Sequence, residues 1–213
     1  MHFQASHGAK PQPIPWQVHT PPPSEWNQCV FVAIEWRRFE AVCEALFAQA
    51  GFKTRSQSQG ADGGVDIWLY SDHAEGLAAI AQCKHWNNRP VGVKEMREFY
   101  GVMASHQLKR GTYATSSTFT EDAWRFAKAN GINAMDGTRL LQQIATRSPA
   151  QQQELLAVAY EGECWRPTCA SCRIKLVERR PANGKAAFWG CVQYPHCRKM
   201  LYQVAPLSPE TVF

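Results

Sequence analysis

Apolar residues recur at helical spacing after Glu35 and predict a long amphipathic helix that Gly51 ends. The residues on its apolar face are Trp36, Phe39, Cys43, Leu46, Phe47 and Ala50. A shorter helix is expected to begin at Ser24, whose side chain is suited to cap it. The next apolar run, 29–34, is rich in β-branched residues and fits a helix or a strand. Residues 52–55 predict a short strand at the edge of a sheet.

Two later segments, 65–70 and 79–84, alternate in the way strands do. Val65, Ile67 and Leu69 are expected on one face, opposite Asp66, Trp68 and Tyr70. In the second segment Ile80, Gln82 and Lys84 share a face, opposite Ala81 and Cys83. Turn-forming residues at 71–76 join the segments into a predicted hairpin. A carboxylate near the start of one strand should therefore meet an amide and an amine at the end of the next.

Helices alternate with strands through the following residues. A helix is predicted over 93–106, a central strand over 111–115, a helix over 121–130 and a strand over 132–135. A last helix is expected after Asp136-Gly137. A hairpin produces antiparallel pairing and helical crossovers produce parallel pairing. The order therefore predicts an α/β fold with a mixed sheet flanked by helices.

The Gly64-Val65-Asp66 motif followed by Gln82-Cys83-Lys84 resembles the Mrr-like branch of the PD-(D/E)xK nucleases, in which glutamine replaces the usual second acid. The likeness runs from Trp36 to Gly137. It includes 90–94, 98–101 and 114–120. The resemblance implies a restriction-endonuclease-like fold and metal-dependent cleavage of DNA.

The family pattern also has a glutamate directly after an aromatic residue on its first helix, which carries over to Glu40. Helical geometry alone does not decide whether Glu35, Glu40 or Glu44 faces the site. The implied role of Glu40 is to bind a metal or a metal-bound water. A solvated helix glutamate is the alternative.

The residue types suit this chemistry. Phosphodiester hydrolysis needs a hard cation, Mg²⁺ or Mn²⁺, held by oxygen atoms. Asp66 can supply a carboxylate, Cys83 a main-chain carbonyl and Gln82 an amide oxygen. Lys84 can orient or deprotonate the attacking water, or stabilise the charge of the transition state. The simpler alternative is a half-buried hairpin whose Asp66 and Lys84 form a surface ion pair.

The composition places the positive charge at the C-terminal end. The chain has 213 residues, 45% of them hydrophobic, and a net charge of +5. Residues 1–163 carry 15 Lys and Arg against 16 Asp and Glu, whereas residues 164–213 carry 8 against 2. This field would attract an anionic polymer such as DNA. No secretory signal or span of ~20 apolar residues is evident. The cysteine pattern favours a reducing cytoplasm.

Four cysteines have the spacing of a zinc site. Cys169, Cys172, Cys191 and Cys197 form a C-x2-C-x18-C-x5-C pattern, which suits two knuckles around one tetrahedral Zn²⁺. Cys164, five residues before Cys169, could compete as a ligand, and so could His196, although Cys197 has the better register. Segments 174–180 and 186–190 are expected to form strands of a ribbon. The stretch also resembles the C-terminal zinc-finger repeats of bacterial type IA topoisomerases, in Phe188-Trp189-Gly190-Cys191 and Tyr194-Pro195-His196-Cys197.

Those repeats bind single-stranded DNA, so the resemblance implies a nucleic-acid-binding module. The predicted DNA contacts in the ribbon are Arg173, Lys175, Arg179, Lys185, Trp189 and Tyr194, which can pair with phosphates or stack on bases. Arg89 and Ser117 are predicted DNA contacts beside the nuclease site. Alternatively, the zinc ion only stabilises a small domain whose aromatic residues form its core.

These observations predict five segments. A Pro-rich flexible segment covers 1–23, a nuclease domain 24–147, a linker 148–163 with a short helix expected over 151–156, a zinc finger 164–204 and a tail 205–213. The predicted function is a metal-dependent endonuclease acting on double-stranded DNA in restriction, with methylated DNA among its candidate substrates. A non-catalytic DNA-binding protein and a repair or junction nuclease are the alternatives. A homodimer would account for cuts on both strands, and the sequence shows no dimer interface.

Overall fold

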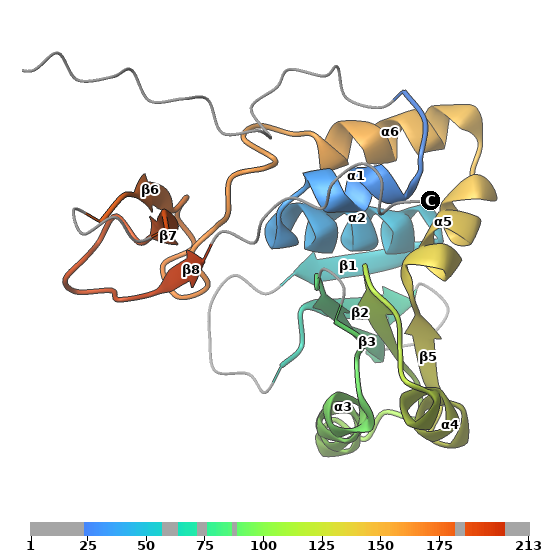
Figure 1. Cartoon of the computed structure of the whole chain (residues 1–213). Coiled ribbons are helices and arrows are strands. Elements are labelled where there is room, and N and C mark those ends of the chain that lie inside the picture. The colour runs from blue at the N-terminus through green and yellow to red at the C-terminus, as the bar shows by residue number, and fades with distance from the viewer. Residues whose placement is uncertain (1–23, 57–63, 72–75, 87–88, 182–185, 203–213) are drawn as a thin grey trace, which may run out of the picture.

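Figure 1 shows the computed structural model, which describes residues 24–56, 64–71, 76–86, 89–181 and 186–202. The helices are α1 (Gln28–Ala33), α2 (Trp36–Gln49), α3 (Val93–Ser105), α4 (Glu121–Ala129), α5 (Gly137–Ala145) and α6 (Pro149–Ala159). The expectations for 1–23, Lys185 and the tail 205–213 lie outside the described residues.

A five-stranded sheet carries the larger part of the chain. Its strands are β1 (Phe52–Ser56), β2 (Ile67–Ser71), β3 (Leu77–Lys84), β4 (Gly111–Thr115) and β5 (Ile132–Met135), paired in that order. The β1–β2 and β2–β3 pairs are antiparallel, and the β3–β4 and β4–β5 pairs are parallel. The predicted mixed sheet and the edge position of β1 are therefore confirmed.

Helices cover both faces of this sheet and enclose two apolar cores (Figure 1). Helices α1, α2, α5 and α6 pack on one face, over Ile67, Leu69, Ala81 and Cys83. Helices α3 and α4 pack on the other, over Ile80 and Tyr113. The predicted alternation of β3 is confirmed by this division. Val65 differs from the prediction, because it precedes the strand and joins the second core instead of the first.

Two segments near the ends of the nuclease fold differ from expectation. Helix α1 begins at Gln28 and is capped by Asn27, so the predicted start at Ser24 is wrong. The carbonyl of Ser24 instead accepts a hydrogen bond from Gln153 of α6 at 3.1 Å. Segment 148–163, expected as a linker, contains α6. Leu155 of this helix is fully buried in the first core, so the segment is a packed part of the fold.

The C-terminal part is a small three-stranded ribbon beside α2 (Figure 1). Its strands are β6 (Val177–Arg179), β7 (Phe188–Gly190) and β8 (Met200–Tyr202), all antiparallel. Its core consists of Leu176, Trp189 and two of the four motif cysteines, Cys169 and Cys191. Among the described residues, no helix has the length and apolar character needed to cross a membrane.

Candidate functional site

Asp66 lies where the chain enters the β2–β3 hairpin. Its backbone N–H donates to the carbonyl of Ala81 at 3.0 Å, which ties it to β3. Its carboxylate oxygen Oδ2 accepts from the backbone N–H of Cys83 at 2.7 Å and from the side-chain amide of Gln82 at 2.6 Å. The structure thus brings Asp66, Gln82 and Cys83 together at one end of the hairpin.

Gly64 makes room for the Gln82 side chain. Gln82 turns its amide nitrogen toward Asp66 because a carboxylate offers only acceptors. Its amide oxygen faces Gly64, where an added Cβ would stand 3.3 Å away. Gly64 also has a φ of +94°, a conformation that L side chains rarely adopt. The glycine of the motif is therefore required by the backbone and by the neighbouring amide.

Glu40 approaches the same carboxylate from α2. Its side chain is 16% exposed, and its Oε2 pairs with Arg37 at 3.1 Å. Burial, and then the charge of Asp66, raise the pKa of Glu40 to about 8 against the opposing effect of Arg37. Burial also raises the pKa of Asp66, although the Cys83 hydrogen bond and the Lys84 charge oppose this. The structure therefore brings Glu40 to Asp66, whereas Glu35 takes part in a separate network.

Lys84 ends β3 beside these carboxylates. Its carbonyl accepts from the Thr115 hydroxyl at 2.8 Å, which fixes the backbone that carries the side chain. Its Nζ lies 5.6 Å from the ring centroid of Trp86, and the Arg89 guanidinium carbon lies 4.1 Å from the same centroid. Arg89 is largely exposed. Two cations and an aromatic ring thus line this edge of the site, where they are suited to a phosphate backbone.

Ser117 lies in the turn after β4, close to the residues that hold the Lys84 carbonyl. Its N–H donates to the Thr115 hydroxyl oxygen at 3.2 Å, and its carbonyl accepts from Gly137 at 3.1 Å. These bonds fix the backbone of the turn. The predicted contact of the Ser117 hydroxyl with DNA stays a prediction.

The donor set around Asp66 fits a hard divalent cation. Asp66 and Glu40 are both half-buried, and the charge of Asp66 adds to burial in raising the pKa of Glu40. A cation between them would offset this repulsion, and carboxylate oxygens are ligands that Mg²⁺ and Mn²⁺ favour. In the structure the Cys83 N–H and the Gln82 nitrogen face Asp66. The Cys83 carbonyl and the Gln82 amide oxygen therefore stay predicted ligands.

The four motif cysteines form one cluster in the ribbon. The sulfur atoms of Cys169, Cys172, Cys191 and Cys197 all lie within 4.8 Å of one another. Cys169 Sγ and Cys197 Sγ are 3.8 Å apart. Zn–S bonds of ~2.3 Å in a tetrahedron would separate two sulfurs by about 3.8 Å, so the cluster fits a Zn²⁺ ion. The rival Cys164 instead packs against the first core.

The predicted DNA contacts of the ribbon differ in how exposed they are and in what they bind within the chain. Trp189 is 8% exposed and packs in the ribbon core, so its predicted stacking on bases is wrong. Lys175 donates to Glu35 and to the carbonyls of Glu163 and Arg166, so its three donors are already used within the chain and its predicted phosphate contact is not favoured. Arg179 donates to the Cys191 carbonyl at 3.3 Å. Tyr194 is 63% exposed and stays a candidate.

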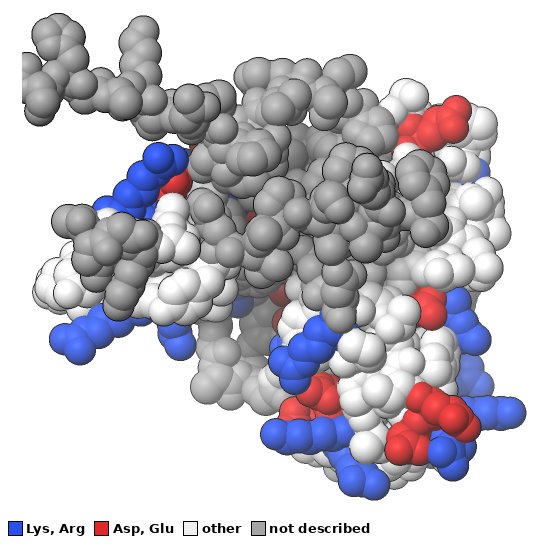
Figure 2. Space-filling view, viewed as in Figure 1, with Lys and Arg blue, Asp and Glu red and all other residues white. Residues whose placement is uncertain are grey.

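Figure 2 shows Lys and Arg side chains at the rim of the ribbon, whereas basic and acidic side chains are interspersed over α3 and α4. The excess of positive charge predicted for the C-terminal part is thus visible on the ribbon surface. A surface of this kind would attract a phosphate backbone without regard to base sequence.

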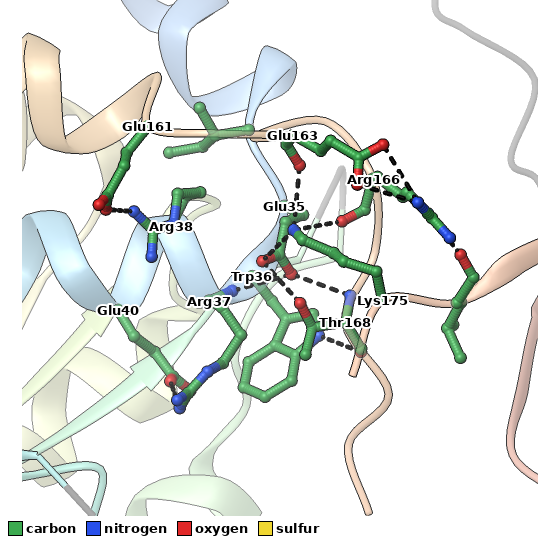
Figure 3. A network of polar contacts seen from close by, with 12 residues as sticks. Glu35, Trp36, Arg37, Arg38, Glu40, Glu161, Glu163, Arg166, Thr168 and Lys175 are labelled. Atoms are coloured by element: carbon green, nitrogen blue, oxygen red, sulfur yellow. Dashed lines mark hydrogen bonds and ion pairs between the residues drawn. The ribbon is translucent and has the colours of Figure 1, made fainter. Parts of the chain in front are cut away.

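Glu35 makes a contact that the sequence analysis missed. It caps α2 through a hydrogen bond from the Arg37 N–H, and its side chain is 4% exposed. Figure 3 shows two ribbon residues meeting this carboxylate. The hydroxyl and backbone N–H of Thr168 donate to it at 3.0 and 3.2 Å, and Lys175 Nζ lies at 3.2 Å. The partners are more than 130 positions away, so no local pattern could reveal the contact.

Trp36 reinforces this junction between the nuclease fold and the ribbon. Its indole N–H donates to the Thr168 carbonyl at 2.8 Å (Figure 3). The backbone N–H of Glu35 donates to the Cys164 carbonyl at 2.6 Å. The N-terminus of α2 is therefore fixed to the ribbon by backbone and side-chain bonds together.

Comparison with known proteins gave several matches. A family model described as a restriction endonuclease, Mrr_cat, matches residues 31–144. The type IV methyl-directed restriction enzyme EcoKMrr of Escherichia coli strain K12 is 35% identical over 98 residues, which are 46% of this chain. The matched part is 32% of that enzyme, so the chain spans about a third of the curated relative.

Two solved structures are also similar over part of their length. The DNA modification-dependent restriction endonuclease AspBHI has 17% identity and a TM-score of 0.47. That match covers 71% of this chain and 45% of the AspBHI chain. The MspJI restriction endonuclease, in complex with a 27-mer oligonucleotide, has 18% identity and a TM-score of 0.42. That match covers 68% of this chain and 34% of MspJI.

Proposed function

Because the chain belongs to the Mrr_cat family of restriction endonucleases, we propose that it is a divalent-cation-dependent nuclease that hydrolyses DNA phosphodiester bonds. One observation carries the proposal. The Asp66 carboxylate accepts from Gln82 and Cys83 at the end of the hairpin, and its charge adds to burial in raising the pKa of Glu40 on α2. Two oxygen-donor groups beside a lysine are the arrangement that this hydrolysis requires.

Each side chain has its own role in this proposal. Asp66 and Glu40 would hold Mg²⁺ or Mn²⁺, which when bound would offset negative charge and lower the pKa of water. Gln82 orients the Asp66 carboxylate through its hydrogen bond. Lys84 orients the attacking water or offsets the charge of the transition state. The water oxygen bonds to phosphorus, the bond to the leaving sugar oxygen breaks, and that oxygen takes up a proton.

The proposed substrate is double-stranded DNA in a restriction setting. The E. coli relative is described as methyl-directed, so methylated DNA is the form to test first. The ribbon is proposed to hold one structural Zn²⁺ through its four cysteines and to contact single strands through the exposed Tyr194. Free thiols throughout the described residues suit a reducing cytoplasm, which we propose as the compartment.

Cleavage of supercoiled plasmid tests the proposal. Methylated and unmethylated plasmid would be incubated with Mg²⁺ or Mn²⁺ and wild type, Asp66→Asn or Lys84→Ala. We expect wild type to cut, and each variant to be slower by about a hundredfold or more. Asp122→Asn, an exposed change on α4, is the matched control and should cut like wild type. No cutting by wild type, with DNA binding retained, would favour the non-catalytic DNA-binding alternative instead.

A further inference from the structure

His85 lies between the two elements that carry the candidate site. It directly follows Lys84 at the end of β3, and its ring stacks on Phe39, the residue of α2 before Glu40. The two ring centroids are 5.2 Å apart, with an angle of 26° between the ring planes. Phe39 is fully buried in the first core. His85 is therefore joined covalently to one side chain of the site and packs against the helix that carries another.

The imidazole of His85 also holds the start of α2. Its Nε2 lies 3.0 Å from the carbonyl oxygen of Ile34, the extended residue that caps the end of α1. A carbonyl oxygen only accepts hydrogen bonds, so Nε2 carries the proton and the ring donates. The other ring nitrogen, Nδ1, is buried and has no hydrogen-bond partner among the described residues. The contacts with Ile34 and Phe39 are therefore the ones that orient the ring.

The peptide group that His85 binds continues to the ribbon. Ile34 and Glu35 share this group, whose carbonyl accepts from His85 and whose N–H donates to the Cys164 carbonyl at 2.6 Å. Hydrogen bonds that follow one another through a peptide group polarise it and strengthen each other. The Glu35 side chain accepts from Thr168 of the ribbon at the same point (Figure 3). A continuous set of contacts thus runs from the ribbon, across the start of α2, to the end of β3.

The end of β3 is held on its other side by β4. The Lys84 carbonyl accepts from the Thr115 hydroxyl at 2.8 Å and from the Ser116 N–H at 3.3 Å. These bonds fix Lys84 to the sheet, whereas the His85 bond fixes the same stretch of chain to the start of α2. The imidazole therefore connects the element that carries Lys84 with the element that carries Glu40.

We propose that His85 is a positioning residue of the nuclease site, which fixes Lys84 and Glu40 relative to each other through the Ile34–Glu35 peptide group. The inference rests on the proposed nuclease function and extends it, because the ribbon docked at Glu35 then supports the geometry of the site as well as attracting DNA. The imidazole acts through Lys84 and Glu40 and does not itself contact the phosphodiester.

Two substitutions separate the hydrogen bond of His85 from its ring. His85→Phe retains a ring that stacks on Phe39 and removes the N–H donor to the Ile34 carbonyl. His85→Gln removes the ring and can place its amide N–H near the position of Nε2. At saturating DNA and Mg²⁺, the single-turnover cleavage rate should fall about tenfold or more for His85→Phe and less than about threefold for His85→Gln. The affinity of both variants for a short duplex in Ca²⁺ should stay within about twofold of wild type.

Trp26→Phe is the matched control for a lost hydrogen bond. The indole N–H of Trp26 donates to the Gln152 carbonyl at 3.0 Å, so this change also removes a ring donor from a backbone carbonyl of the nuclease fold. Measured where all variants are folded, its cleavage rate should stay within about threefold of wild type. A rate for His85→Phe equal to that of Trp26→Phe would overturn the inference, and so would a rate for His85→Gln as low as that of His85→Phe.

Amide hydrogen exchange tests the connection without any cleavage, which separates this inference from the proposed function. The Glu35 N–H reports the contact with the ribbon, and the Ser116 N–H reports the end of β3. His85→Phe should speed the exchange of both amides about tenfold or more, and Trp26→Phe less than about threefold. If wild type cuts no DNA, the proposed nuclease function fails, and these two amides still decide on His85. Faster exchange at neither amide, or at only one, would show that His85 does not join β3 to the ribbon.

Discussion

The side-chain amide of Gln82 donates to Oδ2 of Asp66 at 2.6 Å. The group next to the proposed metal-binding carboxylate is thus a hydrogen-bond donor and not a second negative charge. The bond orients Asp66 in the absence of a cation. The second acid of the proposed site is Glu40, which lies on a different element and whose pKa is raised by burial and by the charge of Asp66.

Gln82→Glu should make the fold depend more strongly on a cation. The new carboxylate would stand where a donor now faces Asp66, so the two charges would repel each other. We expect the melting temperature without Mg²⁺ or Mn²⁺ to fall by about 5 °C and the affinity for Mn²⁺ to rise about tenfold. Thermal melts and calorimetric Mn²⁺ titrations measure both, with the exposed Gln142→Glu as control. Unchanged Mn²⁺ affinity would contradict a site at this position.

Glu40 should make stability depend on pH. Its pKa is about 8 in the fold against an ordinary value of 4.5, so the folded state holds the proton more tightly. This stabilisation is complete below pH 4.5 and is lost as the pH rises through 8, where the fold must carry a buried charge. Between pH 5 and pH 9, wild type should lose on the order of 4 kcal/mol relative to Glu40→Gln. Urea unfolding without Mg²⁺ or Mn²⁺ tests this, and parallel pH curves would refute it.

Glu35 and Lys175 should be energetically coupled. Removing one partner of a buried pair leaves the other without its counter-charge, so Glu35→Gln and Lys175→Met should each lower the free energy of unfolding by about 2 kcal/mol. The double variant should lose at least about 1 kcal/mol less than the sum of the two. Urea unfolding of all four proteins measures the coupling, with Glu44→Gln on α2 as control. Additive losses would mean that Glu35 and Lys175 are not energetically coupled.

Trp189 and Tyr194 should respond to alanine substitution in opposite ways. Trp189 is buried in the ribbon core, so Trp189→Ala should destabilise the ribbon and increase the rate of zinc release to a chelator. Tyr194 is exposed, so Tyr194→Ala should retain zinc and weaken binding to a single-stranded oligonucleotide about tenfold. Chelator-release and fluorescence anisotropy assays distinguish the two. Tight single-strand binding by Tyr194→Ala would exclude a stacking role.

The order of elements in the nuclease fold could be predicted because each signal is local. Alternation identified β2 and β3, and helical spacing identified α2 and α3. The errors arose where tertiary contacts prevail over local preference. Ser24 could cap a helix, yet its carbonyl binds Gln153 of α6. The pattern at 151–156 predicts a short helix, whereas no local signal reports that Leu155 of α6 enters the first core.

The candidate site was predictable only in part for the same reason. Asp66 and Gln82 are close because a hairpin of known register joins them. The choice among Glu35, which caps α2, and Glu40 and Glu44 within it required a resemblance, because the helix alone does not report which face meets the hairpin. Lys175 looked like a DNA contact by its charge. Its true partner, Glu35, is 140 positions away and could not be inferred from sequence spacing.

The junction at Glu35 has a consequence for the chain while it is being synthesised. Helix α2 leaves the ribosome early, whereas Thr168, its partner in the ribbon, follows 133 positions later. A chain that ends before the ribbon leaves the Glu35 carboxylate without Thr168 and Lys175. The start of the helix that carries Glu40 is therefore expected to reach its final position only after the ribbon has been synthesised.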